Sequence, residues 1–145
     1  MKTRLILILC IVAGIAASAF AQDVNGLIIG EKYTKNQIIA ALGKPDYING
    51  GSYIYGRSYF NFDTYDNTFT EFSIVNDKRF VTMTKEFSGG LRVGDKLSKA
   101  KQTKCPIKRE ESDYICFWHY GDWASWVVYY DKNGIITAIA FGILS

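Results

Sequence analysis

His119 is the side chain best suited to acid–base chemistry, and it is the single histidine among the 145 residues. A histidine becomes catalytic only when a nucleophile or a second acid lies against it. Asp122 follows three residues later, so a small hydrolase that uses His119 and Asp122 is one alternative. The chain shows no recognisable Ser-His-Asp motif, no paired carboxylates and no glycine-rich phosphate loop. We therefore predict that it is not an enzyme and holds neither a cofactor nor a metal ion.

Cys105 and Cys116 form the second pair of residues with possible chemistry, and ten residues separate them. In an oxidising compartment such an isolated pair most often forms a disulfide. Closing so small a loop removes roughly 3 kcal/mol of freedom from the unfolded chain. There is no Cys-x-x-Cys motif, and one histidine cannot complete a zinc site without further ligands. We predict a structural disulfide between Cys105 and Cys116.

The first 21 residues have the composition of a secretory signal peptide. Lys2 and Arg4 precede an almost unbroken aliphatic run over residues 5–15, which is shorter than the ~20 residues of a membrane-spanning helix. Ala19 and Ala21 then occupy the positions that a signal peptidase requires. We expect cleavage after Ala21 and a secreted or periplasmic protein.

The charge of the remaining chain is nearly balanced. Without Lys2 and Arg4, the 17 basic residues become 15, against 14 acidic ones. Such a balance predicts no general attraction to nucleic acid.

One phrase occurs twice, as "LIIGEKYTKNQ" from Leu27 and "LRVGDKLSKAK" from Leu91. In the first copy, Thr34 and Gln37 have the spacing of a capping box, so a helix should begin there. In the second copy, Ser98 is the expected N-cap of a shorter helix. A phrase repeated at a distance of 64 residues indicates two related units.

Three strands are predicted after each helix, from segments rich in aromatic and β-branched residues. These segments are "SYIYGRSYFNFD", "TFTEFSIVN" and "RFVTMTKEF" in the first unit, and "DYICFWHY", "WASWVVYYD" and "GIITAIAFG" in the second. We expect an α+β fold in which residues 22–88 and 89–145 form tandem units, each a helix plus a three-stranded antiparallel sheet. The helices should cover one face of a shared sheet, because a single unit buries too little apolar surface to be stable.

The stretch "IGEKYTKNQIIAALGKPD" resembles the helical signature of the SmpA/OmlA-type periplasmic modules. Two such units in tandem, with a disulfide from helix to strand, are similar to the β-lactamase-inhibitor-protein fold. The resemblance implies helices on one face of an antiparallel sheet and a second face that is free to bind proteins.

The hairpin "YICFWHYGDWASWVVYY" contains the candidate binding residues. With a type II′ turn at Gly121-Asp122, Phe117 pairs with Trp126 and His119 with Ala124. If Cys116 faces the helices, Phe117, His119, Trp126 and Tyr130 fall on the open face. The predicted partner-binding residues are Phe117, His119, Asp122, Trp123, Trp126 and Tyr130. The alternative is that these rings simply fill the core of a small sheet protein.

A basic run follows the second phrase: Arg92, Lys96, Lys99, Lys101, Lys104, Lys108 and Arg109. It could hold the protein to an anionic membrane surface as a structural factor of the cell envelope. It could equally be the solvated side of a short helix, because Asp95, Glu110, Glu111 and Asp113 interrupt or follow it.

Overall fold

The computed structural model describes residues 23–84, 87–103, 107–118 and 124–143. The predicted signal peptide and its cleavage site lie outside these residues. A two-stranded sheet consists of β1 (Asp23–Val24) and β2 (Leu27–Ile28), and the two helices are α2 (Lys35–Leu42) and α3 (Leu97–Ala100). The large sheet contains β3 (Tyr47–Asn49), β4 (Ser52–Tyr55), β5 (Ser58–Phe62), β6 (Phe69–Val75), β7 (Ile107–Glu110), β8 (Tyr114–Trp118), β9 (Ala124–Tyr130) and β10 (Ile136–Ile143).

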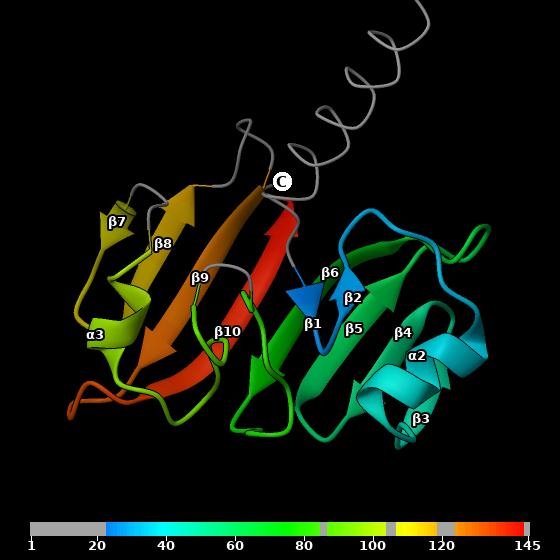
Figure 1. Cartoon of the computed structure of the whole chain (residues 1–145), viewed down its shortest axis with the longest axis horizontal. Coiled ribbons are helices and arrows are strands. Elements are labelled where there is room, and N and C mark those ends of the chain that lie inside the picture. Colours follow the sequence, from blue (N-terminus) through cyan, green and yellow to red (C-terminus); the bar gives the residue numbers. More distant parts are fainter. Residues whose placement is uncertain (1–22, 85–86, 104–106, 119–123, 144–145) are drawn as a thin grey trace, which may run out of the picture.

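The large sheet is antiparallel throughout, with the strand order β3-β4-β5-β6-β10-β9-β8-β7 (Figure 1). The predicted fold class, a tandem repeat of helix plus three-stranded sheet, is therefore wrong. The protein is mostly sheet: β3 to β6 follow α2, β7 to β10 follow α3, and all eight strands form one sheet.

Two of the predicted strands are wrong. "SYIYGRSYFNFD" is not one strand but the hairpin of β4 and β5, because Gly56 adopts a φ of 61° and reverses the chain. The predicted strand "RFVTMTKEF" is instead part of the connection between the two halves of the sheet. Phe80 in this segment packs edge-on against Phe60, with the ring centroids 4.7 Å apart, so its aromatic character serves the core.

The first helix begins as predicted. The Gln37 amide donates to the Thr34 hydroxyl over 3.2 Å, and the Thr34 amide donates to the Gln37 side chain over 2.8 Å. The buried Ile38 and Leu42 hold the helix against the sheet. The second helix begins two residues earlier than expected: Lys96 is the N-cap, and Ser98 lies inside the helix.

The repeated phrase has the same structural task in both copies. Gly30 donates to the Phe69 carbonyl and the Phe69 amide donates back to Glu31, over 2.8 and 2.9 Å. Gly94 and Asp95 form the same two bonds with Ile136, again over 2.8 and 2.9 Å. Phe69 begins β6 and Ile136 begins β10, so each phrase ties its loop to one of the two central strands. Both glycines have φ near 90°, a conformation that favours glycine.

The two halves meet where β6 pairs with β10, and we call this pairing the seam. Ile74 lies opposite Ile139, and Phe72 lies opposite Phe141. All four side chains are buried, and the rings of Phe72 and Phe141 stack with centroids 6.2 Å apart. The core therefore runs continuously from one half to the other.

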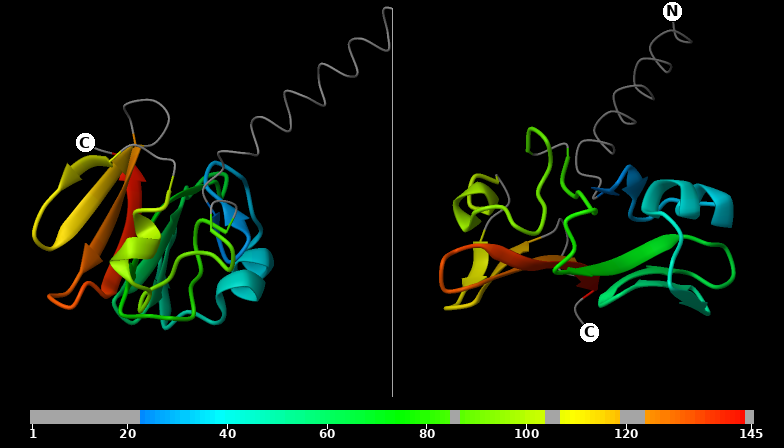
Figure 2. Two further views of the ribbon diagram at one scale, coloured as in Figure 1. Left: turned by 60° about the vertical axis from the view of Figure 1, so that its left-hand side comes forward. Right: turned by 90° about the horizontal axis from the view of Figure 1, so that it is seen from below.

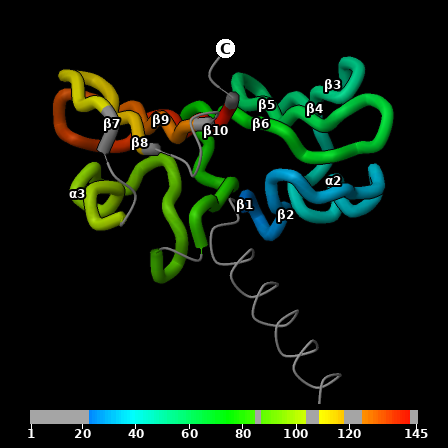
Figure 3. Tube along the Cα trace, turned by 90° about the horizontal axis from the view of Figure 1, so that it is seen from above, coloured from blue at the N-terminus to red at the C-terminus, as the bar shows by residue number. Residues whose placement is uncertain are grey.

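Both helices, β1 and β2 lie on the same side of the large sheet (Figures 2 and 3). The connection after β6 also runs over this side, where Phe80, Met83, Leu91 and Val93 are buried. No described segment lies over the opposite side, which we call the open face (Figure 3).

Phe72→Ala should lower the free energy of unfolding by about 3–5 kcal/mol, because the ring contacts aromatic residues of both halves. Urea denaturation followed by tryptophan fluorescence measures the change. Ser73→Ala, one residue along the same strand on the open face, is the matched control and should change stability by less than about 0.5 kcal/mol. A similar, small effect of both substitutions would show that the seam is not where the core is held together.

Candidate functional site

Phe117 and Trp126 are paired as predicted, but they are not on the open face. The two residues are Cα partners in β8 and β9, and their side chains are only 1% and 0% exposed. Trp126 packs edge-on against Phe72 at 5.5 Å and lies 5.2 Å from the ring of Phe141. Both residues belong to the core beneath the helices, so neither can contribute to an exposed binding surface.

The other predicted binding residues are placed as follows. Tyr130 is half-buried against the core, and its hydroxyl donates to the backbone carbonyl of Glu111. It thus fastens the turn between β7 and β8. His119, Asp122 and Trp123 lie outside the described residues, so the hairpin tip and the hydrolase alternative stay predictions.

The prediction places Phe117 and Trp126 on the wrong face of the sheet because it assumes that Cys116, through the expected disulfide, faces the helices. In the structure Cys116 pairs with Val127, and successive side chains of a strand point to opposite faces. Cys116 is therefore on the open face, half-buried, while its neighbour Phe117 is in the core. Cys105 lies outside the described residues, so the Cys105–Cys116 bridge stays a prediction.

The true open face is revealed by the register of the sheet. One row of directly paired residues crosses all eight strands: Tyr47, Ile54, Tyr59, Ser73, Ala140, Val127, Cys116 and Arg109. A shorter parallel row contains Val75, Ala138, Tyr129 and Tyr114. These two rows define an aromatic surface on both halves.

Tyrosines are the largest exposed side chains of this face. Tyr47 is 59% exposed, Tyr59 37% and Tyr129 41%. Tyr129 packs against Tyr114, with ring centroids 5.8 Å apart. Between the tyrosines of the two halves, the seam presents small side chains: Ser73, Ala138, Ala140 and Gly142. The centre of the open face, which carries these small side chains, is therefore lower than the tyrosine-bearing surface on either side; we call it the low centre.

Three hydrogen-bonded polar side chains lie side by side on β4, β5 and β6 of the open face. The Ser52 hydroxyl donates to the Asn61 carbonyl oxygen over 2.6 Å, and the Asn61 amide donates to Glu71 over 2.5 Å. Burial, together with the negative charge of Glu71, raises the pKa of the Tyr59 hydroxyl. The Tyr59 hydroxyl therefore stays protonated at neutral pH and can donate a hydrogen bond.

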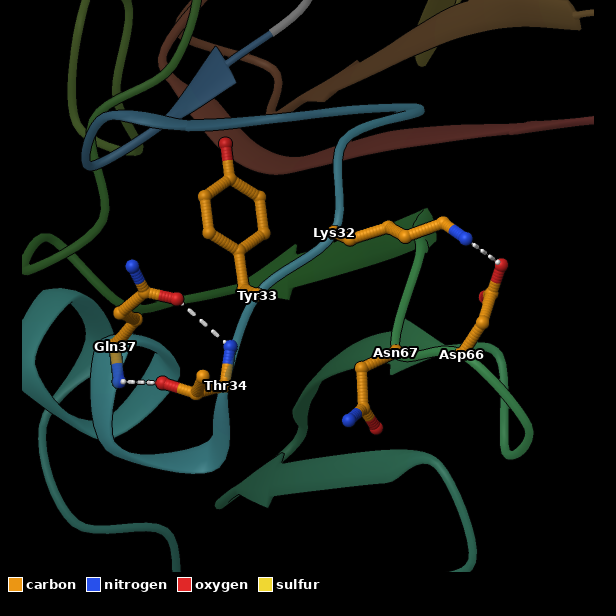
Figure 4. Close-up of a pocket in the computed structure, with 6 residues that line it drawn as sticks. All are labelled: Lys32, Tyr33, Thr34, Gln37, Asp66 and Asn67. Carbon is orange, nitrogen blue, oxygen red and sulfur yellow. Dashed lines mark hydrogen bonds and ion pairs between the residues drawn. The ribbon is translucent and has the colours of Figure 1, made fainter.

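A small polar hollow lies at the start of α2, on another part of the surface (Figure 4). Its volume is about 220 Å³, below the range of about 300–1,000 Å³ that is usual for small-molecule sites. Figure 4 shows that its polar groups bind each other: Thr34 and Gln37 form the helix cap, and Lys32 reaches Asp66 over 2.8 Å. We interpret the hollow as part of the helix start and of the β5–β6 turn.

Three members of the basic run are ion-paired where the structure describes it, while Arg92 and Lys96 have no ion pair with a described residue. Lys99 pairs with Asp95 over 3.0 Å, and Lys101 pairs with Glu110. Arg109 pairs with Glu111 over 2.5 Å, which raises the pKa of the guanidinium. Lys104 and the side chain of Lys108 are not among the parts of the chain that the structure describes. These pairs favour the interpretation of a solvated helix side over that of a membrane-binding patch.

Two further features limit what the described residues could do. Within the described ranges, no three His, Cys, Asp or Glu side chains come together in a way that could hold a metal ion. None of the helices in those ranges is long and apolar enough to cross a membrane.

No protein-family model matches the chain, and the comparison with curated proteins gives no match. Among solved structures, the chain is similar to a DUF4309 family protein (YjgB) from Bacillus subtilis. The sequence identity is 17%, the alignment covers 83% of this chain and 84% of that chain, and the TM-score is 0.41. So distant a likeness assigns the chain to no family.

The Lys32–Asp66 pair makes a prediction about pH. Lys32 and Thr68 both bond the Asp66 carboxylate and lower its pKa from 3.8 to about 2. A pKa lower in the folded than in the unfolded state stabilises the fold above pH ~3.8, and this contribution disappears as the pH falls toward 2. Lys32→Met should raise the Asp66 pKa, but not fully to 3.8, because Thr68 still donates.

A carbon-13 NMR titration of the Asp66 carboxyl group measures this pKa. Lys35→Met, which removes a nearby exposed lysine from the first turn of α2, is the control and should leave the titration unchanged. Equal titrations in the wild type and in Lys32→Met would contradict the assigned pair.

Proposed function

We propose that the chain is a non-catalytic binding module, secreted or periplasmic, that engages a protein partner through the open face of its sheet. The observation that carries this proposal is the exposure of Tyr47, Tyr59 and Tyr129 on a sheet face that no described segment covers. The binding residues differ from those expected from the sequence, since Phe117 and Trp126 are in the core. Inhibition of an extracytoplasmic enzyme and assistance in envelope assembly are both compatible with such a module.

The size of the open face favours a protein over a small molecule. Eight strands about 4.8 Å apart span roughly 34 Å, and strands of about five residues are roughly 17 Å long. The face therefore measures on the order of 600 Å², close to the ~800 Å² that each partner buries in a standard protein interface.

The composition of the face also suits a protein partner. Tyrosine offers a large apolar ring together with a polar hydroxyl, so it can be exposed to water when free and buried when bound. Tyrosines are enriched among the residues that dominate binding energy at interfaces. The small side chains of the seam let the backbone of a partner approach the sheet between the tyrosines.

Photo-crosslinking tests the proposal. A benzophenone amino acid at position 59 or 129 should form adducts with a specific protein of the extracytoplasmic extract, identified by mass spectrometry. The same group at position 65 should not form them, because Tyr65 is 97% exposed but lies in the β5–β6 turn, away from the open face. Tyr65 is thus the matched control for an exposed tyrosine.

The identified protein is then titrated against purified variants. Tyr59→Ala combined with Tyr129→Ala should weaken binding at least about tenfold, which corresponds to 1.4 kcal/mol. Tyr65→Ala should bind like the wild type. Equal adducts at all three positions, or an unchanged Kd for the double variant, would contradict the proposal. A face that binds glycans and yields no protein adducts would assign it to carbohydrate instead.

A further inference from the structure

Glu71 is an uncompensated acidic residue on the open face. It lies on β6, half-buried, next to the strip of small side chains at the seam. The other described charge on this face, Arg109 on the edge strand β7, is paired with Glu111. Glu71 has no ion-pair partner among the described residues. A half-buried charge without a counter-charge costs free energy that a cation can recover.

The hydrogen bonds around Glu71 fix one carboxylate oxygen and leave the other available. Asn61 donates to Oε1 over 2.5 Å, and the Ser52 hydroxyl orients Asn61 by donating to its carbonyl oxygen. In both of these hydrogen bonds the donor lies on the side away from Glu71 and the acceptor toward it. The two bonds therefore hold the Glu71 carboxylate in place without neutralising its charge. No described group donates to Oε2.

Oε2 lies over the seam, at a position where the neighbouring strand has no side chain. A Cβ atom built on Gly142 would stand 3.3 Å from this oxygen. Any larger residue at position 142 would therefore crowd the carboxylate from the side of β10. Apart from Gly142 and its two neighbours in the chain, only Glu71 among the described residues has atoms within 4 Å of that Cβ position, which leaves space beside Oε2.

We infer that Glu71 receives a cationic side chain, an arginine or a lysine, of the protein partner that binds the open face. This inference rests on the proposed function and identifies the chemistry of its central contact. Charge complementarity selects the occupant: one carboxylate with one available oxygen matches one guanidinium or ammonium group. A metal ion needs several ligands, and among the described residues Glu71 belongs to no group of three His, Cys, Asp or Glu side chains.

Arginine fits the surroundings better than lysine. Tyr59 is paired with Ser73, two residues from Glu71 on the same face, so Tyr59 and Glu71 are diagonal cross-strand neighbours, whose backbones are roughly 7–8 Å apart. A guanidinium that bonds Oε2 can stack on the Tyr59 ring at the same time. The Asn61 amide already occupies Oε1, so the contact would use one oxygen of Glu71.

Two defined peptides test the contact. The first is the acetylated and amidated pentapeptide Gly-Ser-Arg-Ser-Gly, and the second carries citrulline, the uncharged analogue, in place of arginine. In nitrogen-15 NMR titrations the arginine peptide should shift the amide signals of Asn61, Glu71 and Gly142. The citrulline peptide should bind at least about tenfold more weakly, because it lacks the charge.

Variants of the protein make the same test from the other side. Glu71→Gln keeps the shape but removes the charge and should weaken the arginine peptide at least about tenfold. Gly142→Ala fills the space beside Oε2 and should weaken it as well, with the charge intact. Glu31→Gln, an exposed glutamate outside the open face, is the control and should bind like the wild type. Equal binding of the two peptides, shifts that collect elsewhere, no shift, or full binding by Glu71→Gln would each overturn the inference.

The inference and the proposed function fail in different ways. If the crosslinked partner loses affinity for the Tyr59→Ala and Tyr129→Ala double variant but binds Glu71→Gln like the wild type, only the contact at Glu71 is wrong. If neither variant loses affinity for the partner, the open face is not the binding surface.

Discussion

The structure depends on the pairing of β6 with β10. Each central strand alternates large apolar residues with small or polar ones, so Phe72 and Ile74 flank Ser73, and Ile139 and Phe141 flank Ala140. Because side chains alternate between faces, the register that buries the four apolar side chains must place Ser73 opposite Ala140 on the other face. A slip of one strand by one residue would turn its phenylalanine and isoleucine of this pairing to the open face. The low centre of the open face is thus a consequence of how the core is closed.

The helices explain why one face remains open. α2 has eight residues and α3 has four, and both pack on the face of the sheet that carries the buried apolar side chains. An antiparallel sheet can leave its second face to water if that face is polar enough. Here Ser52 donates to Asn61 and Asn61 donates to one oxygen of Glu71, while Tyr47, Tyr59 and Tyr129 present both ring and hydroxyl. The face can therefore remain in contact with water.

The sequence predicted the features that local interactions decide. The Thr34–Gln37 cap and the pairing of Phe117 with Trp126 depend on residues near each other in the chain, and both are confirmed. The assignment of faces depends on where the helices lie, which no alternation pattern reveals. The aromatic pair was therefore grouped correctly but placed on the wrong side. On the exposed face Tyr129 lies opposite Ala138 of the neighbouring strand, a neighbourhood that becomes visible only once the strand register is known.

The remaining errors have tertiary causes. β3 has three exposed residues at the edge of the sheet, so it has no buried alternation by which it could be recognised. The segment around Phe80 has strong strand propensity, yet its ring is required above the sheet, where it packs against Tyr55 and Phe60. Propensity describes a fit to a half-buried pleated surface, and the same residues also fit a connection that closes a core.

Charge shows most clearly why composition alone does not identify a site. The basic run is conspicuous in the sequence, but Asp95, Glu110 and Glu111 pair with Lys99, Lys101 and Arg109, so the charge of these three residues is partly compensated within the fold. Glu71 is inconspicuous, a single acid within a strand of mixed polarity. The fold places it on the open face, orients it through Asn61 and sets Gly142 beside it. Whether a charge is available for binding is decided by its neighbours in space, and these come from strands that are 10 and 71 residues away in the chain.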